Sequence, residues 1–126
     1  MFSLKEAIQI HEVLITRFGG AQGVRDQAGL ESALARPVQT FDGVDLYPAP
    51  QAKAAALMES LVINHPFVDG NKRIAYTLYR LCLLNAGLDI GANQAERYEM
   101  VIEASKGELR FEDLLTWTEK HLQKST

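Results

Sequence analysis

Apolar residues recur at helical spacing along most of the chain. In "SLKEAIQIHEVLITRF" they fall every three or four positions, and Ser3 and Glu6 stand at capping-box spacing at its start. This pattern predicts a helix over residues 3–18, ended by the glycine pair that follows. A short second helix is predicted over residues 27–36, because Asp26 is a suitable N-cap and a proline stands beyond the end.

Four further segments have helical spacing or composition, and the segment that precedes them does not. In "VQTFDGVDLYPAP" the β-forming Val38, Phe41 and Val44 surround an Asp-Gly turn signal, so a loop or small hairpin is expected near residues 38–48. No repeat, linker or low-complexity stretch interrupts residues 1–126, which we interpret as a single all-α domain of about six helices with one flap. The four further helices are expected over residues 51–64, 71–86, 94–106 and 111–124.

Composition and charge narrow the class of protein. The net charge of −3 lacks the basic surplus of a general nucleic-acid binder, and no apolar stretch is long enough to span a bilayer. Lys5 and Glu6 come early and no apolar signal region follows them. The single cysteine, Cys82, lies in an apolar run and is expected to be buried. We therefore expect an intracellular domain, located in the cytoplasm, with no membrane contact.

The three histidines have no metal-ligand spacing, which excludes a zinc site. His11 lies on the apolar stripe of the first helix and is expected to be a hydrogen-bonded core residue. His121 is expected at the surface of the last helix. In the flap, Phe41, Asp42 and Tyr47 either dock a target segment by strand addition or belong to a packed loop, and the sequence leaves both options open.

The stretch "HPFVDGNKR", residues 65–73, combines the groups that phosphoryl or nucleotidyl transfer requires. His65 can exchange a proton near neutral pH, and Asp69 is a hard carboxylate suited to Mg²⁺. Gly70 lets the backbone approach a ligand, and Asn71 opens a helix whose free N–H groups form an anion site. Lys72 and Arg73 put two cations at this positive end of a helix, a cost that a bound phosphate would remove.

Each of these residues also has a plain structural reading. His-Pro can stop a helix, Asp-Gly-Asn is a common turn, and the two cations can be solvated surface charges. The joint occurrence of a base, a metal ligand, a glycine and two cations within one short loop is what favours a functional site.

"HPFVDGNKR" resembles the signature of the Fic/Doc superfamily, and "RFGGAQGVRDQAGLESALARP" is similar to the N-terminal region of its Doc-type toxins. The resemblance implies one role for each matching residue, with ATP and Mg²⁺ as cofactors. His65 corresponds to the base that deprotonates a target hydroxyl, Asp69 to the Mg²⁺ ligand, and Phe67 to the buried anchor of the loop, while Pro66 only stiffens it. The phosphate-binding turn corresponds to Gly70 and Asn71, and the phosphate-contacting cations to Lys72 and Arg73.

Two positions depart from the Fic enzymes that transfer AMP and follow the Doc pattern. Those enzymes usually have glycine where Lys72 stands and a further arginine where Tyr76 stands, and Arg80 is too far along the helix to replace that arginine. The resemblance therefore implies a protein kinase that phosphorylates elongation factor Tu and stops translation. An AMP transferase on the same fold is the alternative, and a catalytically silent binding protein is the second alternative.

Regulation is expected to come from a separate protein. Self-restrained Fic proteins carry an inhibitory helix with Ser or Thr followed four residues later by Glu, and this chain contains no such run. Doc-type toxins are instead restrained by an antitoxin of the Phd type, whose disordered tail folds against the toxin. The resemblance thus implies a Phd-like antitoxin as partner, in a type II toxin-antitoxin system.

Overall fold

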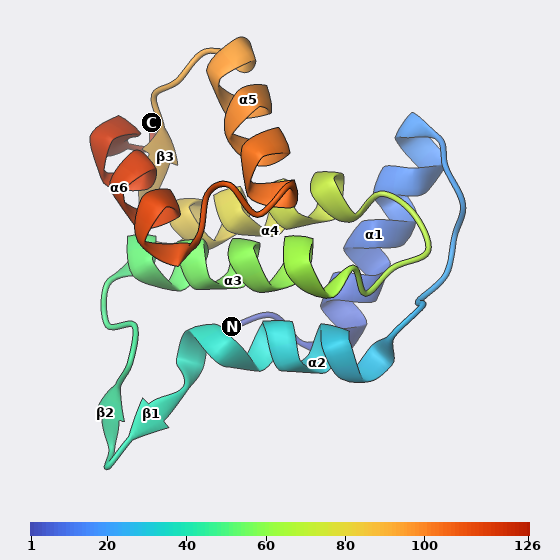
Figure 1. The fold of residues 1–126 in the computed structure, drawn as a ribbon, viewed down its shortest axis with the longest axis horizontal. Helices are drawn as coiled ribbons and strands as arrows, with labels where there is room; N and C mark the ends of the chain where they lie inside the picture. Colours follow the sequence, from blue (N-terminus) through green and yellow to red (C-terminus); the bar gives the residue numbers. More distant parts are fainter.

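The computed structural model describes residues 1–126 and contains six α-helices, as the sequence predicts (Figure 1). One short 3-10 helix and two antiparallel strand pairs complete it. The α-helices are α1 (Leu4–Phe18), α2 (Gln27–Ala35), α3 (Pro50–Asn64), α4 (Asn71–Asn85), α5 (Gln94–Ser105) and α6 (Phe111–His121). The remaining elements are η1 (Arg36–Val38), β1 (Thr40–Phe41), β2 (Val44–Asp45), β3 (Leu88–Ile90) and β4 (Leu122–Lys124).

The paired helices α3 and α4 form the centre of the molecule. In Figure 1 they run side by side, with α2 on one side of the pair and α5 and α6 on the other, while α1 crosses near the end that carries the loop between α3 and α4. Small residues on α3, among them Ala54, Ala55 and Ala56, have no exposed surface and allow close packing. Cys82 of α4 is buried as predicted, and burial raises the pKa of its thiol to about 11.

Local capping signals fix where several helices begin. Ser3 accepts a hydrogen bond from the Glu6 N–H while the Glu6 carboxylate accepts one from the Ser3 N–H, which is the predicted capping box. Asn93 and Glu96 make the same pair of bonds at the start of α5. Asp26 caps α2 through the Gly29 N–H, again as predicted.

A buried carboxylate connects three segments. Glu59 of α3 is 6% exposed and contacts the guanidinium groups of Arg36 at 2.8 Å and Arg110 at 3.0 Å. Burial alone would raise the pKa of Glu59, but the hydrogen bonds from both arginines lower it below its usual value. These contacts join α3 to η1 and to the start of α6.

The C-terminal helix is shorter than predicted. It ends at His121, and residues 122–124 form β4, which pairs antiparallel with β3. Pairing supplies backbone hydrogen-bond partners to β3, which a longer C-terminal helix would leave unpaired. The expectation that His121 lies at the surface is wrong, because its side chain is only 12% exposed, stacks on Trp117 and contacts Glu96 at 3.5 Å.

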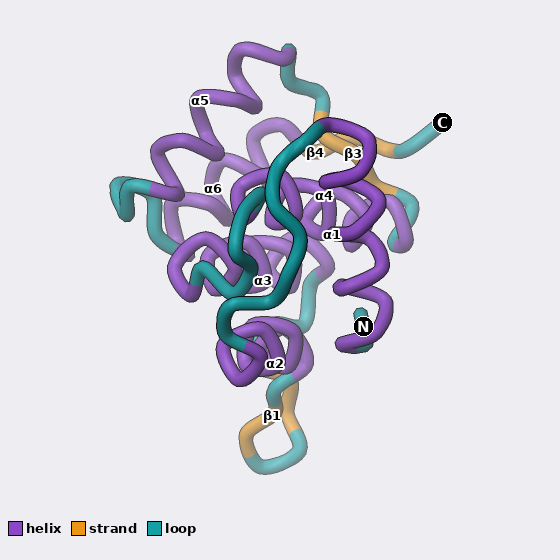
Figure 2. Tube along the Cα trace, turned by 90° about the vertical axis from the view of Figure 1, so that its right-hand side faces the viewer, coloured by secondary structure: helices purple, strands orange, loops and turns teal.

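The predicted hairpin is present between β1 and β2. Asp42 and Gly43 both have positive φ, which the tight turn requires, and Phe41 and Val44 are exposed beside it. The hairpin projects from the helical body (Figures 1 and 2) and precedes the N-terminal end of α3. The loop of residues 65–70 follows the other end of α3, roughly 22 Å away by helical rise.

Candidate functional site

The loop of residues 65–70 begins with a strained histidine. His65 ends α3 in the left-handed region, with φ 46° and ψ 55°, a conformation that costs free energy for a residue other than glycine. The Arg25 guanidinium stabilises this backbone by donating hydrogen bonds of 2.8 Å to the carbonyls of both Asn64 and His65. Arg25 thus lies beside the start of the loop.

The segment before α2 lies along the loop and pairs with it. The N–H groups of Arg25 and Asp26 donate to the carbonyl of Pro66, and the Val68 N–H donates to the Gly23 carbonyl. Phe67, between these bonds, is 1% exposed and lies in the main core cluster. The middle of the loop is therefore fixed to the core and to the segment before α2, while His65 and Asp69 on either side of it are exposed.

Asn71 fastens the loop through its side chain. Its Oδ1 accepts a hydrogen bond from the Phe67 N–H, and its Nδ2 donates one to the Phe67 carbonyl, both at 2.9 Å. The two bonds fix which end of the amide is nitrogen, and that nitrogen also lies 3.3 Å from Nδ1 of His65. Because an amide nitrogen only donates, Nδ1 accepts, and the neutral His65 ring carries its proton on Nε2.

Asp69 is held by backbone groups on both carboxylate oxygens. The Ala21 N–H donates to Oδ2 at 3.1 Å and the Gly70 N–H donates to Oδ1 at 2.8 Å. These bonds lower the pKa of Asp69 below its ordinary value, so the group is an anion at neutral pH. The Asp69 backbone carbonyl accepts a hydrogen bond of 2.7 Å from Nε2 of His11.

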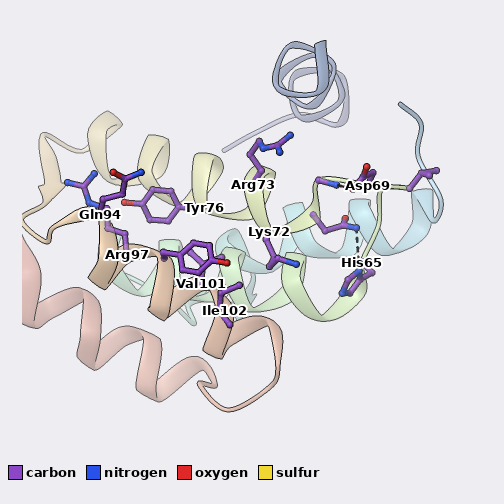
Figure 3. A pocket seen from close by; sticks show the side chains of 13 residues that line it. His65, Asp69, Lys72, Arg73, Tyr76, Gln94, Arg97, Val101 and Ile102 are labelled. Atoms are coloured by element: carbon purple, nitrogen blue, oxygen red, sulfur yellow. Dashed lines mark hydrogen bonds between the residues drawn. The ribbon is translucent and has the colours of Figure 1, made fainter. Parts of the chain in front are cut away.

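Lys72 and Arg73 point in different directions from the first turn of α4 (Figure 3). Lys72 lines a pocket between the loop, α4 and α5 and has an exposed side chain. The Arg73 side chain donates to the Gly19 carbonyl at 3.0 Å and lies over the Phe18 ring. Neighbouring helical residues are about 100° apart around the axis, so the two side chains leave the helix in different directions, although both residues line the pocket.

A pocket of about 910 Å³ opens between the loop, α4 and α5 (Figure 3). Tyr76 lines it further along α4, and one side carries the sequence-predicted residues His65, Asp69, Gly70, Asn71, Lys72 and Arg73. Arg80 is engaged elsewhere, in a two-bond contact of 2.9 and 3.0 Å with Asp89, in agreement with the expectation that it does not replace a missing arginine. The volume is at the upper end of the range for small-molecule sites, so the pocket has room for more than a phosphate group.

The opposite wall of the pocket is a face of α5 that the motif did not indicate. Its residues have the spacing of one helical face, so the sequence signal was the amphipathic pattern of residues 94–106. Nothing in that pattern says which other helix the face opposes. The residues of this wall are Gln94, Arg97, Tyr98, Val101 and Ile102.

The donor set fits a magnesium ion shared with a ligand better than one held by protein alone. No group of three or more histidine, cysteine, aspartate or glutamate side chains is placed to hold a metal ion. Asp69 is the one carboxylate that lines the pocket, and it is ionised and exposed. Mg²⁺ bound with nucleotide phosphates typically uses one or two protein carboxylates, which this arrangement satisfies.

None of the helices has the length and apolar character that a membrane-spanning segment requires.

Comparison with known proteins shows which family the chain matches. Residues 1–83 match the family described as Fic/DOC family. The chain belongs to the Fic/DOC family. The matched residues include the whole loop and most of α4, whereas the α5 wall of the pocket lies beyond them.

One curated protein that is similar to this chain is Toxin Doc of Mycolicibacterium smegmatis (strain ATCC 700084 / mc(2)155). It is 47% identical over 76 residues, which cover 60% of this chain and 58% of the relative. The aligned part thus spans less than two thirds of the relative's length. This match supports a likeness to Doc-type members of the Fic/DOC family.

Proposed function

We propose that this protein is a Doc-type toxin that uses ATP and Mg²⁺ to phosphorylate a hydroxyl group of a protein. The observation that carries the proposal is the meeting of His65, Asp69 and Lys72 in one pocket, at the N-terminus of α4. A base, a hard carboxylate and a cation beside free helix N–H groups are suited to binding and transferring a phosphoryl group.

In the proposed reaction the hydroxyl oxygen of the target attacks the γ-phosphorus of ATP. The bond between that phosphorus and the β–γ bridging oxygen breaks, ADP leaves with the electron pair, and the hydroxyl proton passes to His65. In the neutral ring the available lone pair is on Nδ1, in long contact with Asn71, and rotation of the exposed ring would turn it toward the pocket. The products are a phosphorylated protein, ADP and a protonated imidazole.

Asp69 is the residue that would hold the magnesium ion, since it is the one pocket carboxylate and is ionised. When bound with ATP, Mg²⁺ neutralises phosphate charge. The backbone bonds from Ala21 and Gly70 hold the carboxylate in place before any ligand arrives. The N–H groups at the start of α4 and the Lys72 ammonium contribute the remaining positive charge.

Lys72 supports phosphoryl transfer over AMP transfer. A lysine at this position adds volume and charge beside the turn formed by Gly70 and favours ATP bound with its γ-phosphate toward the target hydroxyl. We expect Lys72→Gly to weaken phosphoryl transfer. If neither phosphoryl nor adenylyl transfer changes in this variant, Lys72 does not orient the nucleotide.

The proposed target is elongation factor Tu, and the proposed partner is an antitoxin of the Phd type. Both follow from the likeness to Doc-type toxins, of which the mycobacterial relative is one by name. The absence of a self-inhibitory run in the sequence supports restraint by a second protein. Modification of this factor would stop translation, which accounts for toxicity.

The test is intact-protein mass spectrometry after incubation with ATP, Mg²⁺ and elongation factor Tu. A gain of one phosphoryl mass that is lost with His65→Ala supports the proposal. A gain of one adenylyl mass would instead assign AMP transfer. If His65→Ala modifies the target as well as the unchanged protein does, His65 is not the base. A chain that shows no Mg²⁺-dependent affinity for ATP would be a silent binding protein.

A further inference from the structure

A second cavity, of about 360 Å³, lies between α1, the segment before α2 and the loop of residues 65–70. It shares no lining residue with the larger pocket beside α5, and its size falls within the range of small-molecule sites. Its apolar lining is formed by Ile8, Val24 and Phe67, and Val24 pairs with Phe67 through an isolated β-bridge. No lysine or arginine lines this cavity, so its lining supplies no fixed positive charge.

One ring nitrogen of His11 has no hydrogen-bond partner. Nε2 donates to the Asp69 carbonyl, which only accepts, so in the neutral ring the lone pair is on Nδ1. Only the Tyr76 hydroxyl and Arg97 Nε are both fully buried and without a partner, so Nδ1 of His11 reaches open space. His11 is 2% exposed and lines this cavity but not the larger pocket. The lone pair is therefore accessible from the cavity.

The other polar side chains of the cavity also present acceptors. Gln22 donates through Nε2 to the Glu12 backbone carbonyl at 3.2 Å and to the Thr16 hydroxyl oxygen at 3.3 Å, which leaves its Oε1 without a partner. The Glu12 carboxylate is exposed and forms no ion pair. The cavity thus has an imidazole nitrogen, an amide oxygen and a carboxylate that all lack a donor.

A primary alkylammonium group matches this lining. It carries one positive charge, donates three hydrogen bonds and accepts none. Its methylene chain is apolar and suits the aliphatic and aromatic side chains of the cavity, as lysine side chains do on protein surfaces. An anion would be repelled by the Glu12 carboxylate and would find no cation to pair with, and an uncharged alcohol would leave the carboxylate uncompensated.

We propose that this cavity binds a primary alkylammonium group, with the ammonium held by Nδ1 of His11, the Glu12 carboxylate and Oε1 of Gln22. The methylene chain then lies against Ile8 and Val24. A free amine and the lysine side chain of another protein both provide this chemistry. The proposal does not depend on the proposed function, because none of these residues belongs to the loop.

Occupancy of the cavity acts on the loop through the His11 ring. A donor on Nδ1 polarises the ring and strengthens the hydrogen bond that Nε2 donates to the Asp69 carbonyl. The same ring stacks on Phe67, so one ring separates the bound ammonium from two residues of the loop. An alkylammonium bound here therefore tightens the contact between α1 and the loop.

The test is titration of the isotope-labelled chain with n-butylammonium chloride at constant ionic strength, with the histidine ring nitrogens followed by NMR. At mildly alkaline pH histidine rings are ordinarily neutral and the ammonium is still protonated. Nδ1 of His11 should shift as the ammonium binds. His121 should not respond, because both of its ring nitrogens already contact groups of the protein.

Two related molecules separate the contributions of charge and hydrogen bonding. n-Butyltrimethylammonium has the charge and no N–H donor, and it should bind about tenfold more weakly. n-Butanol has the same chain and no charge, and it should bind about fivefold more weakly. If either molecule binds as tightly as n-butylammonium, recognition of an ammonium group is wrong.

A pair of exposed substitutions locates the site. Glu12→Gln removes the carboxylate charge and should weaken binding of n-butylammonium about fivefold. Glu99→Gln, on α5 and outside the cavity, is the matched control and should leave the affinity unchanged. Equal weakening by both variants would show attraction to the overall negative charge and would overturn the site.

Acetyl-Gly-Lys-Gly-amide distinguishes the two sources of the ammonium. Tighter binding of this peptide than of n-butylammonium assigns the site to a protein lysine, and tighter binding of n-butylammonium assigns it to a free amine. If neither molecule shifts Nδ1 of His11, the proposal is wrong. Slower exchange of the Nε2 proton with solvent in the occupied protein supports the effect on the loop, and unchanged exchange would contradict that effect.

Discussion

His11 of α1 donates a hydrogen bond of 2.7 Å from Nε2 to the backbone carbonyl of Asp69, a residue 58 positions further along the chain. The same ring stacks on Phe67, with ring centroids 3.8 Å apart and planes within 11°. His11 is 2% exposed and is the hydrogen-bonded core histidine that the sequence predicted. His11 therefore contacts the motif loop from the core, at the backbone of Asp69, the residue proposed to bind the metal ion.

We expect His11→Phe to separate these two contacts, because phenylalanine keeps the stacked ring and removes the donor. The Asp69 carbonyl would lose its partner, which should lower the free energy of unfolding by about 1–3 kcal/mol. The proposed transfer rate should fall more than tenfold, since the backbone of Asp69 would lose one of the contacts that position it. Urea unfolding and the mass-spectrometric assay measure the two effects, and an unchanged transfer rate would show that His11 contributes only packing.

Arg25 provides a second test of how the loop is held. Arg25→Met removes the hydrogen bonds to the carbonyls of Asn64 and His65, so the strained His65 backbone should relax. We expect a loss of about 1 kcal/mol in the free energy of unfolding and a clear fall in transfer. Arg17→Met is the matched control, because Arg17 is exposed and contacts the Phe18 ring alone. Equal transfer by the two variants would contradict a role for Arg25 in positioning His65.

The adjacent glycines Gly19 and Gly20 allow strain and crowding to be distinguished. Both have positive φ, 90° and 122°, so alanine is unfavourable at either position. A Cβ at Gly19 would meet nothing within 4 Å, whereas one at Gly20 would lie 2.8 Å from the Asp69 carboxylate. We expect both variants to lose stability, and only Gly20→Ala to require more Mg²⁺ for half-maximal transfer. A titration of activity with Mg²⁺ would reveal the difference, and identical curves would argue against Asp69 as the metal ligand.

The Arg80–Asp89 pair predicts a pH dependence of stability. Hydrogen bonds from Arg80 lower the pKa of Asp89 from 3.8 to about 2, so folding is favoured by the ionised carboxylate. The stabilisation is complete above the unfolded value of 3.8 and is lost as pH falls through the folded value of about 2. Because the Arg80 side chain is 40% exposed, we expect about 1 kcal/mol at most.

Asp89→Asn should remove this part of the acid sensitivity. Urea unfolding of the variant and of the unchanged protein, repeated across the window between those two pKa values, would measure it. Parallel stability curves for the two proteins would show that Asp89 does not contribute.

Most elements of the fold are set by local sequence. The Ser3–Glu6 and Asn93–Glu96 boxes, the Asp26 cap and the Asp42-Gly43 turn satisfy or shape backbone groups within a few residues, so they can be read without knowledge of the fold. The β3–β4 pairing could not be predicted in this way. It joins Leu88–Ile90 to Leu122–Lys124, and neither segment has a partner until the helices between them have folded.

The candidate site also has one part that local sequence predicts and one part that it does not. The sequence by itself determined the chemistry of the loop, since His65, Asp69 and Lys72 come from one short segment whose spacing brings them together. Tertiary structure alone decided that Arg73 turns toward Gly19 and that α5 faces the loop with Tyr98 and its neighbours. Side-chain direction and the opposition of two helices depend on packing over long sequence distances, which a pattern along the chain does not encode.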